Sequence, residues 1–146
     1  MKIHKLVGTL FAVAFASALQ LVNPSTALSA PSPWGGGYSA TLISPTAGAV
    51  LYPGERVRVE WSATLPQTDA GMCEAELWLS LDGGRTFSFC ITPQMDPKAR
   101  YFYWTVPNMP TKTAVLDIRF GCEHYYPECF APQPASMFTI ANSLSQ

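Results

Sequence analysis

The stretch that decides the fold reads Ser80-Leu81-Asp82-Gly83-Gly84-Arg85-Thr86-Phe87. Apolar and polar residues alternate on both sides of it, over residues 73–80 and 87–91. A period of two is typical of strands that bury one face. Asp82-Gly83-Gly84 supplies residues that accept positive φ, as a tight hairpin turn requires. We therefore predict a central β-hairpin with a three-residue loop, whose register pairs apolar residues with each other: Leu79 with Phe87 and Leu77 with Phe89.

Five positions of this stretch form a spaced motif: Ser80, Asp82, Gly84, Thr86 and Phe87. The spacing resembles the Asp-box, the S-x-D-x-G-x-T-aromatic hairpin of sialidases and other β-propellers. In those proteins the box lies away from the catalytic centre, so the resemblance implies a structural hairpin in which side chains bond turn amides. A propeller is excluded by size, because each blade needs about 40–50 residues and several blades must close.

The N-terminus has the pattern of a secretory signal peptide. Basic residues precede an apolar run over residues 6–22, Pro24 follows it, and small residues stand at the −3 and −1 positions before a cleavage after Ala27. We predict residues 1–27 to be this peptide, with Ala18 and Ala30 as alternative cleavage points. The protein is then secreted or periplasmic, without a membrane span after cleavage.

The rest of the chain reads as one β-domain over residues 39–141, between a flexible Pro-, Ser- and Gly-rich lead-in (28–38) and a disordered tail (142–146). Strand patterns recur with turn signals about every ten residues, and no stretch has a helical period. The expected strands are 38–43 with a short continuation at 48–52, 56–63, the two hairpin strands, 100–106, 114–120 and 136–140. Their alternation predicts inward side chains for Val59, Trp61, Leu116, Ile118 and Phe120, and outward side chains for Arg56, Arg58, Tyr101, Tyr103, Asp117 and Arg119. This pattern predicts an all-β sandwich of about seven antiparallel strands.

The order of these signals is similar to that of an exported bacterial immunoglobulin- or fibronectin type III-like domain. The residues that carry the resemblance are Ser44-Pro45, Pro53-Gly54-x5-Glu60-Trp61, Leu79-Ser80-x-Asp82-Gly83-Gly84, Tyr103-Trp104-x-Val106-Pro107 and Phe138-Thr139-Ile140. Such domains accompany enzymes or adhesins, so the resemblance implies a module that recruits a partner.

Four cysteines in an exported chain predict two disulfides among Cys73, Cys90, Cys122 and Cys129. Proximity in sequence favours Cys73–Cys90 with Cys122–Cys129. The inward or outward facing of the residues favours Cys73–Cys122 with Cys90–Cys129. We expect the local pairing, because facing rules often fail where a strand frays. A zinc site of all four thiols lacks the usual C-x2-C spacing.

Charge and motifs exclude several classes of function. After Ala27 the chain holds seven Lys and Arg against ten Asp and Glu, without a clustered basic run, so neither nucleic acid nor an anionic membrane is an expected partner. No hydrolase, metalloprotease or phosphate-loop motif occurs, and we expect no catalytic residue, cofactor or metal. Glu74 and Glu76 share an outer strand face, where we expect them to pair with Arg119 rather than to act as a catalytic pair.

The predicted binding end lies where three loops and the cysteines gather: residues 65–72, 92–99 and 121–134. The third loop carries the candidate contacts Glu123, His124, Tyr125 and Tyr126, and an outward Trp78 is a further candidate. The alternative is that the two tyrosines fold back and cap the core. We interpret the protein as a secreted non-catalytic module that contacts another exported protein. A carbohydrate-binding module using exposed aromatic residues is the second interpretation, and a glycoside hydrolase suggested by the Asp-box is the third.

Overall fold

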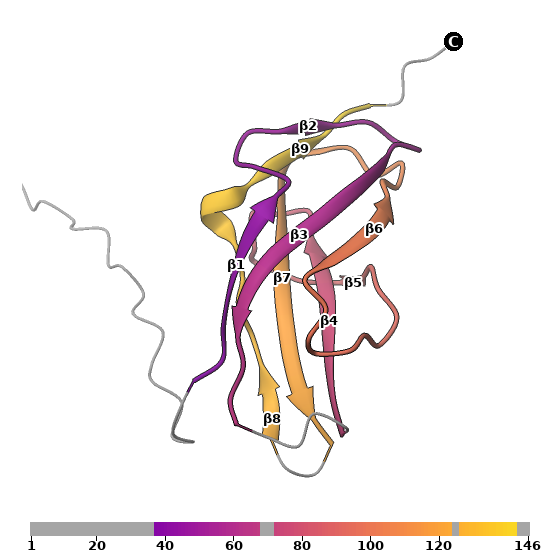
Figure 1. The fold of residues 1–146 in the computed structure, drawn as a ribbon. Helices are drawn as coiled ribbons and strands as arrows, with labels where there is room; N and C mark the ends of the chain where they lie inside the picture. The colour runs from indigo at the N-terminus through magenta and orange to yellow at the C-terminus, as the bar shows by residue number, and fades with distance from the viewer. Residues whose placement is uncertain (1–36, 68–71, 124–125, 143–146) are drawn as a thin grey trace, which may run out of the picture. The chain divides into compact units, whose positions relative to one another are not determined.

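The computed structural model describes residues 37–67, 72–123 and 126–142 (Figure 1). The predicted signal peptide, most of the lead-in and most of the tail lie outside these residues. The described chain is all-β apart from one short 3-10 helix. Its elements are β1 (Ser39–Ser44), β2 (Val50–Leu51), β3 (Arg56–Thr64), β4 (Cys73–Ser80), β5 (Phe89–Cys90), β6 (Tyr101–Thr105), β7 (Thr111–Cys122), β8 (Tyr126–Cys129), the 3-10 helix η2 (Pro134–Ser136) and β9 (Phe138–Ile140).

The strands form two sheets that face each other. One sheet has the order β1-β3-β6, and the other has the order β2-β9-β7-β4-β5, with β8 also paired to β7. All pairs are antiparallel except β2 with β9. The Gln133 side chain joins the two sheets at one side, because it donates to the carbonyl oxygen of Ala40 and accepts from the amide of Leu42, both at 3.0 Å.

The larger of two hydrophobic clusters in the described chain lies between the sheets. Residues from both sheets are almost fully buried in it, among them Val59, Trp61, Leu77, Leu79, Trp104, Leu116, Ile118, Phe138 and Ile140. Each buried side chain of this size contributes roughly 1.5–3 kcal/mol relative to an exposed one. The two-residue period therefore predicted the inner face well, and the outward positions Arg56, Arg58, Tyr101 and Tyr103 are exposed as expected.

The central hairpin exists, but its register differs from the predicted one. Leu79 pairs with Phe89, not with Phe87, and the return strand β5 has only two residues. The amides that would close a three-residue turn are taken by the Asp82 carboxylate, which accepts from the Arg85 and Thr86 amides at 3.0 and 2.9 Å. The loop is consequently longer, and Phe89, predicted to face inward, is 40% exposed at the sheet edge.

The motif side chains hold this loop together as predicted. The Ser80 hydroxyl donates to Asp82 Oδ1 at 2.7 Å and accepts from the Gly84 amide at 2.9 Å. The Thr86 hydroxyl donates to Asp82 Oδ2 at 2.8 Å. These hydrogen bonds, the one from Ser80 first, hold the pKa of the Asp82 carboxyl below its usual range. Gly83 and Gly84 both adopt positive φ, at 77° and 85°.

Strand β7 carries a buried carboxylate where the sequence predicted an exposed one. Asp117 does lie on the outer face of its sheet, but only 1% of it is exposed. The chain returning after β8 covers it, and the Ala131 amide donates to Asp117 Oδ1 at 2.8 Å. The predicted loop 121–134 is thus partly ordered along β7, as β8 and as a bridge between Asp117 and Pro132.

The expected local pairing of the cysteines is wrong. A disulfide joins Cys73 to Cys122, whose residues are directly opposite on β4 and β7, while Cys90 and Cys129 are free thiols. Cys90 lies on β5 and Cys129 on β8, with β4 and β7 between these strands. A Cys90–Cys129 bridge, the other half of the facing-based alternative, is therefore absent as well.

The two free thiols give a testable expectation. We expect the oxidised protein to have lost two protons relative to its reduced mass, not four, and to carry two reactive thiols per chain. Cys90 is exposed and should be alkylated first. Cys129 is partly covered, and burial raises its thiol pKa, so it should react slowly at neutral pH. Peptide mapping after alkylation checks both, and a mass deficit of four protons would contradict the structure.

Candidate functional site

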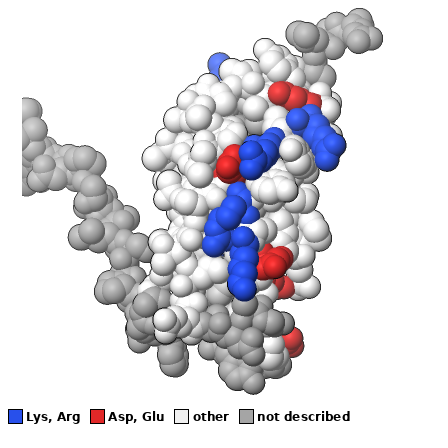
Figure 2. Space-filling model, viewed as in Figure 1, with Lys and Arg blue, Asp and Glu red and all other residues white. Residues whose placement is uncertain are grey.

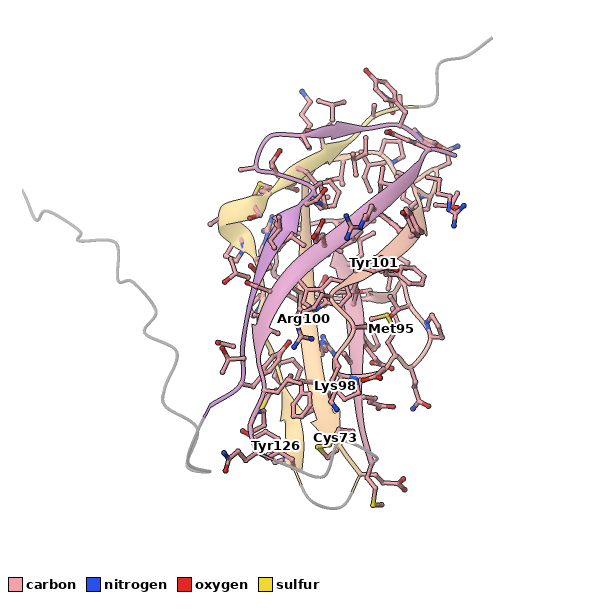
Figure 3. The ribbon with its side chains drawn as sticks, viewed as in Figure 1. Cys73, Met95, Lys98, Arg100, Tyr101 and Tyr126 are labelled. Atoms are coloured by element: carbon pink, nitrogen blue, oxygen red, sulfur yellow. A yellow bond between two sulfur atoms is a disulfide. The ribbon has the colours of Figure 1, made fainter. Side chains whose placement is uncertain are left out.

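An open hollow of about 1210 Å3 lies at the end of the molecule where the disulfide is found. All three predicted loops contribute to it: the first through Met72, the second through residues 94–98, and the third through Gly121, Cys122, Glu123, Tyr126 and Glu128. Figure 3 shows Cys73 and Tyr126 at this end of the folded domain, and Lys98 and Met95 also line the hollow. The expected gathering of the loops is therefore confirmed for the residues that the structure describes.

The lining of the hollow is predominantly acidic. Its charged residues are Glu74, Glu76, Asp96, Glu123 and Glu128 against Lys98 and Arg119. Burial raises the pKa of the Glu74 carboxyl above its usual range, and the negative charges of Glu76, Glu123 and Glu128 raise it further. These side chains are thus close enough to repel one another. The site disfavours its own charge and attracts positive groups.

Arg119 organises the wall formed by β4 and β7. Its guanidinium lies 4.3 Å from the ring centre of Trp78 and 4.8 Å from that of Phe130. It pairs with Asp117 at 2.8 Å and with Glu128 at 3.0 Å, rather than with Glu74 or Glu76 as the sequence suggested. A guanidinium between two aromatic rings is stabilised by cation–π attraction and keeps its in-plane donors available.

The structure places some of the predicted contact residues in the hollow, and others lie outside the described residues. Trp78 and Glu123 both line the hollow, so the structure brings together two candidates that are distant in sequence. The Trp78 ring is only partly exposed, because Arg119 covers it and its Nε1 donates to Glu76 Oε2 at 2.8 Å. His124 and Tyr125 lie outside the described residues.

Tyr126 packs in a small cluster with Phe120 and Cys122 and also lines the hollow. It is 8% exposed and packs edge-on against Phe120, with ring centres 5.7 Å apart. Tyr38 stacks on the same Phe120 at 5.4 Å. The Tyr126 hydroxyl makes no hydrogen bond of ordinary geometry within the described chain, although it lies close enough to the Cys129 thiol to oppose the rise of that thiol's pKa. Tyr126 covers buried groups, as the capping alternative expects, and it also lines the hollow, so its role as a contact residue stays a prediction.

A second surface was missed in the sequence. On the outer face of the β1-β3-β6 sheet, Arg56 lies 4.7 Å from the Tyr103 ring centre and Arg58 lies 4.6 Å from that of Tyr101. Lys and Arg side chains follow one another down this face (Figure 2), although the sequence holds no basic run. The signal was present as R-x-R opposite Y-x-Y, but only the pairing of β3 with β6 joins the two.

The comparisons with known proteins give no relative: no family model matches the chain, and neither the curated proteins nor the solved structures contain a significant match. Among the residues that the structure describes, none belongs to a helix long and apolar enough to cross a membrane. Nor do the described Cys, Asp and Glu side chains form a group suited to a metal ion.

Proposed function

We propose that this protein is an exported, non-catalytic binding module, and that its acidic hollow receives a cationic segment of another protein. The observation that carries the proposal is the convergence of three loops on an open site with five carboxylates and two cations. Like-charged groups held together on a folded surface reduce stability and are typical of functional sites. A partner bearing Lys or Arg would relieve this repulsion.

The fold supports a module of the immunoglobulin or fibronectin type III kind. The order β1-β3-β6 facing β2-β9-β7-β4-β5 is an arrangement expected of such a sandwich, and loops at one end are its usual binding elements. The Cys73–Cys122 disulfide suits an oxidising compartment, which supports export. The Asp-box likeness fits the hydrogen-bonded loop after β4, where Ser80, Asp82 and Thr86 bond one another and the turn.

The hollow also makes contact surface available to a protein partner. Met72 is 43% exposed and lines the site beside the acidic groups. Flexible apolar side chains next to carboxylates suit a cationic amphipathic segment, because both the charge and the apolar face of such a segment find a counterpart. Two of the acidic side chains, Glu76 and Glu128, are already oriented by Trp78 and Arg119. Less ordering is then required on binding.

Replacing Glu74 by Gln tests this proposal. We expect binding of a fluorescent peptide in which lysine alternates with leucine to weaken about fivefold, or about 1 kcal/mol for a partly solvated ion pair. The melting temperature should stay constant or rise, because the change removes a carboxylate that its neighbours repel. Fluorescence anisotropy and thermal unfolding measure the two effects. The matched control is Glu60→Gln on the other sheet, which should leave peptide binding unchanged.

The same residue predicts how binding depends on pH. Because the Glu74 pKa is raised in the free protein, acidification protonates it at a higher pH than an ordinary glutamate. Its protonation relieves repulsion and favours folding, but it removes a charge from the site. Peptide affinity should therefore fall as stability rises on mild acidification, and Glu74→Gln should flatten both trends. Affinity that is independent of Glu74 and of pH would contradict a binding role for the hollow.

The two other interpretations have their own tests. The exposed rings of Tyr101 and Tyr103 favour a carbohydrate-binding module, and a glycan array with Tyr101→Ala and Tyr103→Ala variants examines it. The raised pKa of Glu74 beside Glu76 is what the acid of a glycoside hydrolase would need. Turnover of glycosides that Glu74→Gln abolishes would establish that activity in place of the non-catalytic function.

A further inference from the structure

Strand β6 leaves one backbone edge open. It is the last strand of the β1-β3-β6 sheet, and within residues 37–67, 72–123 and 126–142 no strand pairs with its other side (Figure 1). Its sequence, Tyr101-Phe102-Tyr103-Trp104-Thr105, contains no charge and no proline. Proteins usually protect such an edge with charged residues, proline, a bulge or a covering segment, because an unprotected edge pairs readily with another strand.

The hydrogen bonds to β3 define which backbone groups are open. The Trp61 amide donates to the Arg100 carbonyl, and the Val106 amide donates to the Glu55 carbonyl. In an antiparallel pair the direction alternates from residue to residue, so Phe102 and Trp104 bond to β3. The N–H and C=O groups of the alternate residues point to the free edge: Tyr101, Tyr103 and Thr105.

Two arginines reach this edge from the neighbouring strand. Arg56 lies over the Tyr103 ring and Arg58 over the Tyr101 ring, so their guanidinium groups are carried from β3 toward β6. Stacking on a ring leaves in-plane N–H donors free for a carboxylate. Arg58 shares its charge with Glu60 at 3.0 Å, whereas Arg56 has no ion pair among the described side chains. Lys and Arg side chains are gathered on this face of the sheet (Figure 2).

We propose that β6 receives an extended acidic segment of another protein as an additional antiparallel or parallel strand. The backbone of Tyr101, Tyr103 and Thr105 would bond the segment, and Arg56 and Arg58 would select Asp or Glu at alternate positions. Alternate residues of a strand stand about 6.6–6.8 Å apart on one face, so the two arginines on β3 and alternate acidic residues on the added strand share one spacing. In strand addition the main chain supplies affinity and the alternate side chains supply specificity.

Charge argues against a second copy of the same strand as the occupant. Pairing β6 with β6 of another molecule would place the Arg56 and Arg58 groups of both copies on the same continued face, and like charges across paired strands are unfavourable. No residue of β6 lines the acidic hollow, and the hollow is not needed for the proposal. The two surfaces would therefore accept partners of opposite charge.

The experiment uses the full mature protein and a peptide in which glutamate alternates with threonine and valine. We expect anisotropy to show binding, and amide exchange followed by NMR to show new protection at Tyr101, Tyr103 and Thr105 only. Peptides with contiguous glutamates, with lysine in place of glutamate, or with N-methylated alternate amides should bind at least about tenfold more weakly. Arg56→Glu should weaken the glutamate peptide about tenfold and improve the lysine peptide.

Controls separate strand addition from other causes. Lys112→Glu makes the same change of charge at an exposed position on β7 and should change affinity by less than about twofold. Should Arg56→Glu fail to fold, Arg56→Gln with an unchanged melting temperature tests the same contact. Equal binding of the contiguous-glutamate peptide would overturn the proposal, and so would binding without amide protection. Protection of β6 in the absence of peptide, together with a dimer on gel filtration, would make a second copy the occupant and also overturn it.

Discussion

Cys73→Ser should lower the free energy of unfolding by about 4 kcal/mol, which is the value expected for a cross-link that closes a loop of this length. Cys73 and Cys122 are separated by 49 residues. The bond restricts the unfolded chain, so removing it increases the entropy of unfolding even where the folded packing persists. Urea unfolding of the oxidised wild type and the variant measures the difference.

Variants of the other cysteines provide the controls for this effect. Cys122→Ser should lower the free energy of unfolding by the same amount as Cys73→Ser. The double variant should be no less stable than either single variant, because all three lose the same disulfide. Cys90→Ser alters an exposed thiol and should stay within about 0.5 kcal/mol of the wild type. A large loss of stability in Cys90→Ser, with Cys122→Ser neutral, would show a different pairing.

The strand pattern could be predicted because it depends on neighbours in sequence. The alternation of residues 56–63 placed Val59 and Trp61 in the core and Arg56 and Arg58 outside, and the structure confirms each. A strand with one buried face has a period of two whatever it pairs with. For the same reason the inner positions of β7 were right, although its actual length and its partners were not predictable.

The register of the hairpin and the burial of Asp117 depend on contacts that the alternation of apolar and polar residues does not predict. The Asp82 carboxylate competes with the strand ladder for the Arg85 and Thr86 amides, and this moved the partner of Leu79 to Phe89. Asp117 has the outward facing that alternation predicts, yet the chain after β8 returns over it. Both errors arise where side chains bond backbone groups of other segments.

The sequence predicted the location of the candidate site better than it predicted the residues that form the site. The three loops do gather, because strand order alone brings their ends together. The facing of the cysteines correctly suggested Cys73–Cys122, whereas proximity in sequence misled, since β4 and β7 are neighbours in space but not in the chain. The basic face was missed for the same reason: Arg56 and Arg58 meet Tyr103 and Tyr101 only through the pairing of β3 with β6.

The second large effect concerns the wall of the hollow, where we expect Arg119→Met to cost about 3–5 kcal/mol. Arg119 is the cation that compensates Asp117, whose side chain is only 2% exposed, at a distance of 2.8 Å. Methionine keeps an unbranched apolar side chain but removes the guanidinium, so the buried Asp117 carboxylate loses its cationic partner. An unpaired buried charge lowers the free energy of unfolding by more than an intact ion pair usually raises it. The loss of stability should therefore exceed that of an ordinary surface substitution.

A matched substitution identifies the origin of this loss. Arg58→Met breaks the exposed pair with Glu60, in which the side chains are 47% and 33% exposed, and should cost less than about 1 kcal/mol. Asp117→Asn combined with Arg119→Met should recover part of the stability, since the uncompensated charge is then absent. A double variant that is less stable than Arg119→Met alone would assign the effect to lost packing on Trp78 and Phe130 instead.

The pH dependence of Arg119→Met tests the electrostatic cause directly. In the wild type, burial raises the pKa of the Asp117 carboxyl, and the Arg119 hydrogen bond and charge oppose this rise. Without Arg119 the folded-state pKa should rise further above the unfolded value, so the folded variant holds a proton that the unfolded chain has lost. Stability then falls as pH increases between these two values, and the deficit is fully present above the folded-state pKa. We therefore expect Arg119→Met to approach the wild type in mildly acidic buffer and to be least stable relative to it at neutral pH. If Arg119→Met is less stable than the wild type by the same amount at both pH values, then lost packing, and not the Asp117 charge, causes the loss of stability.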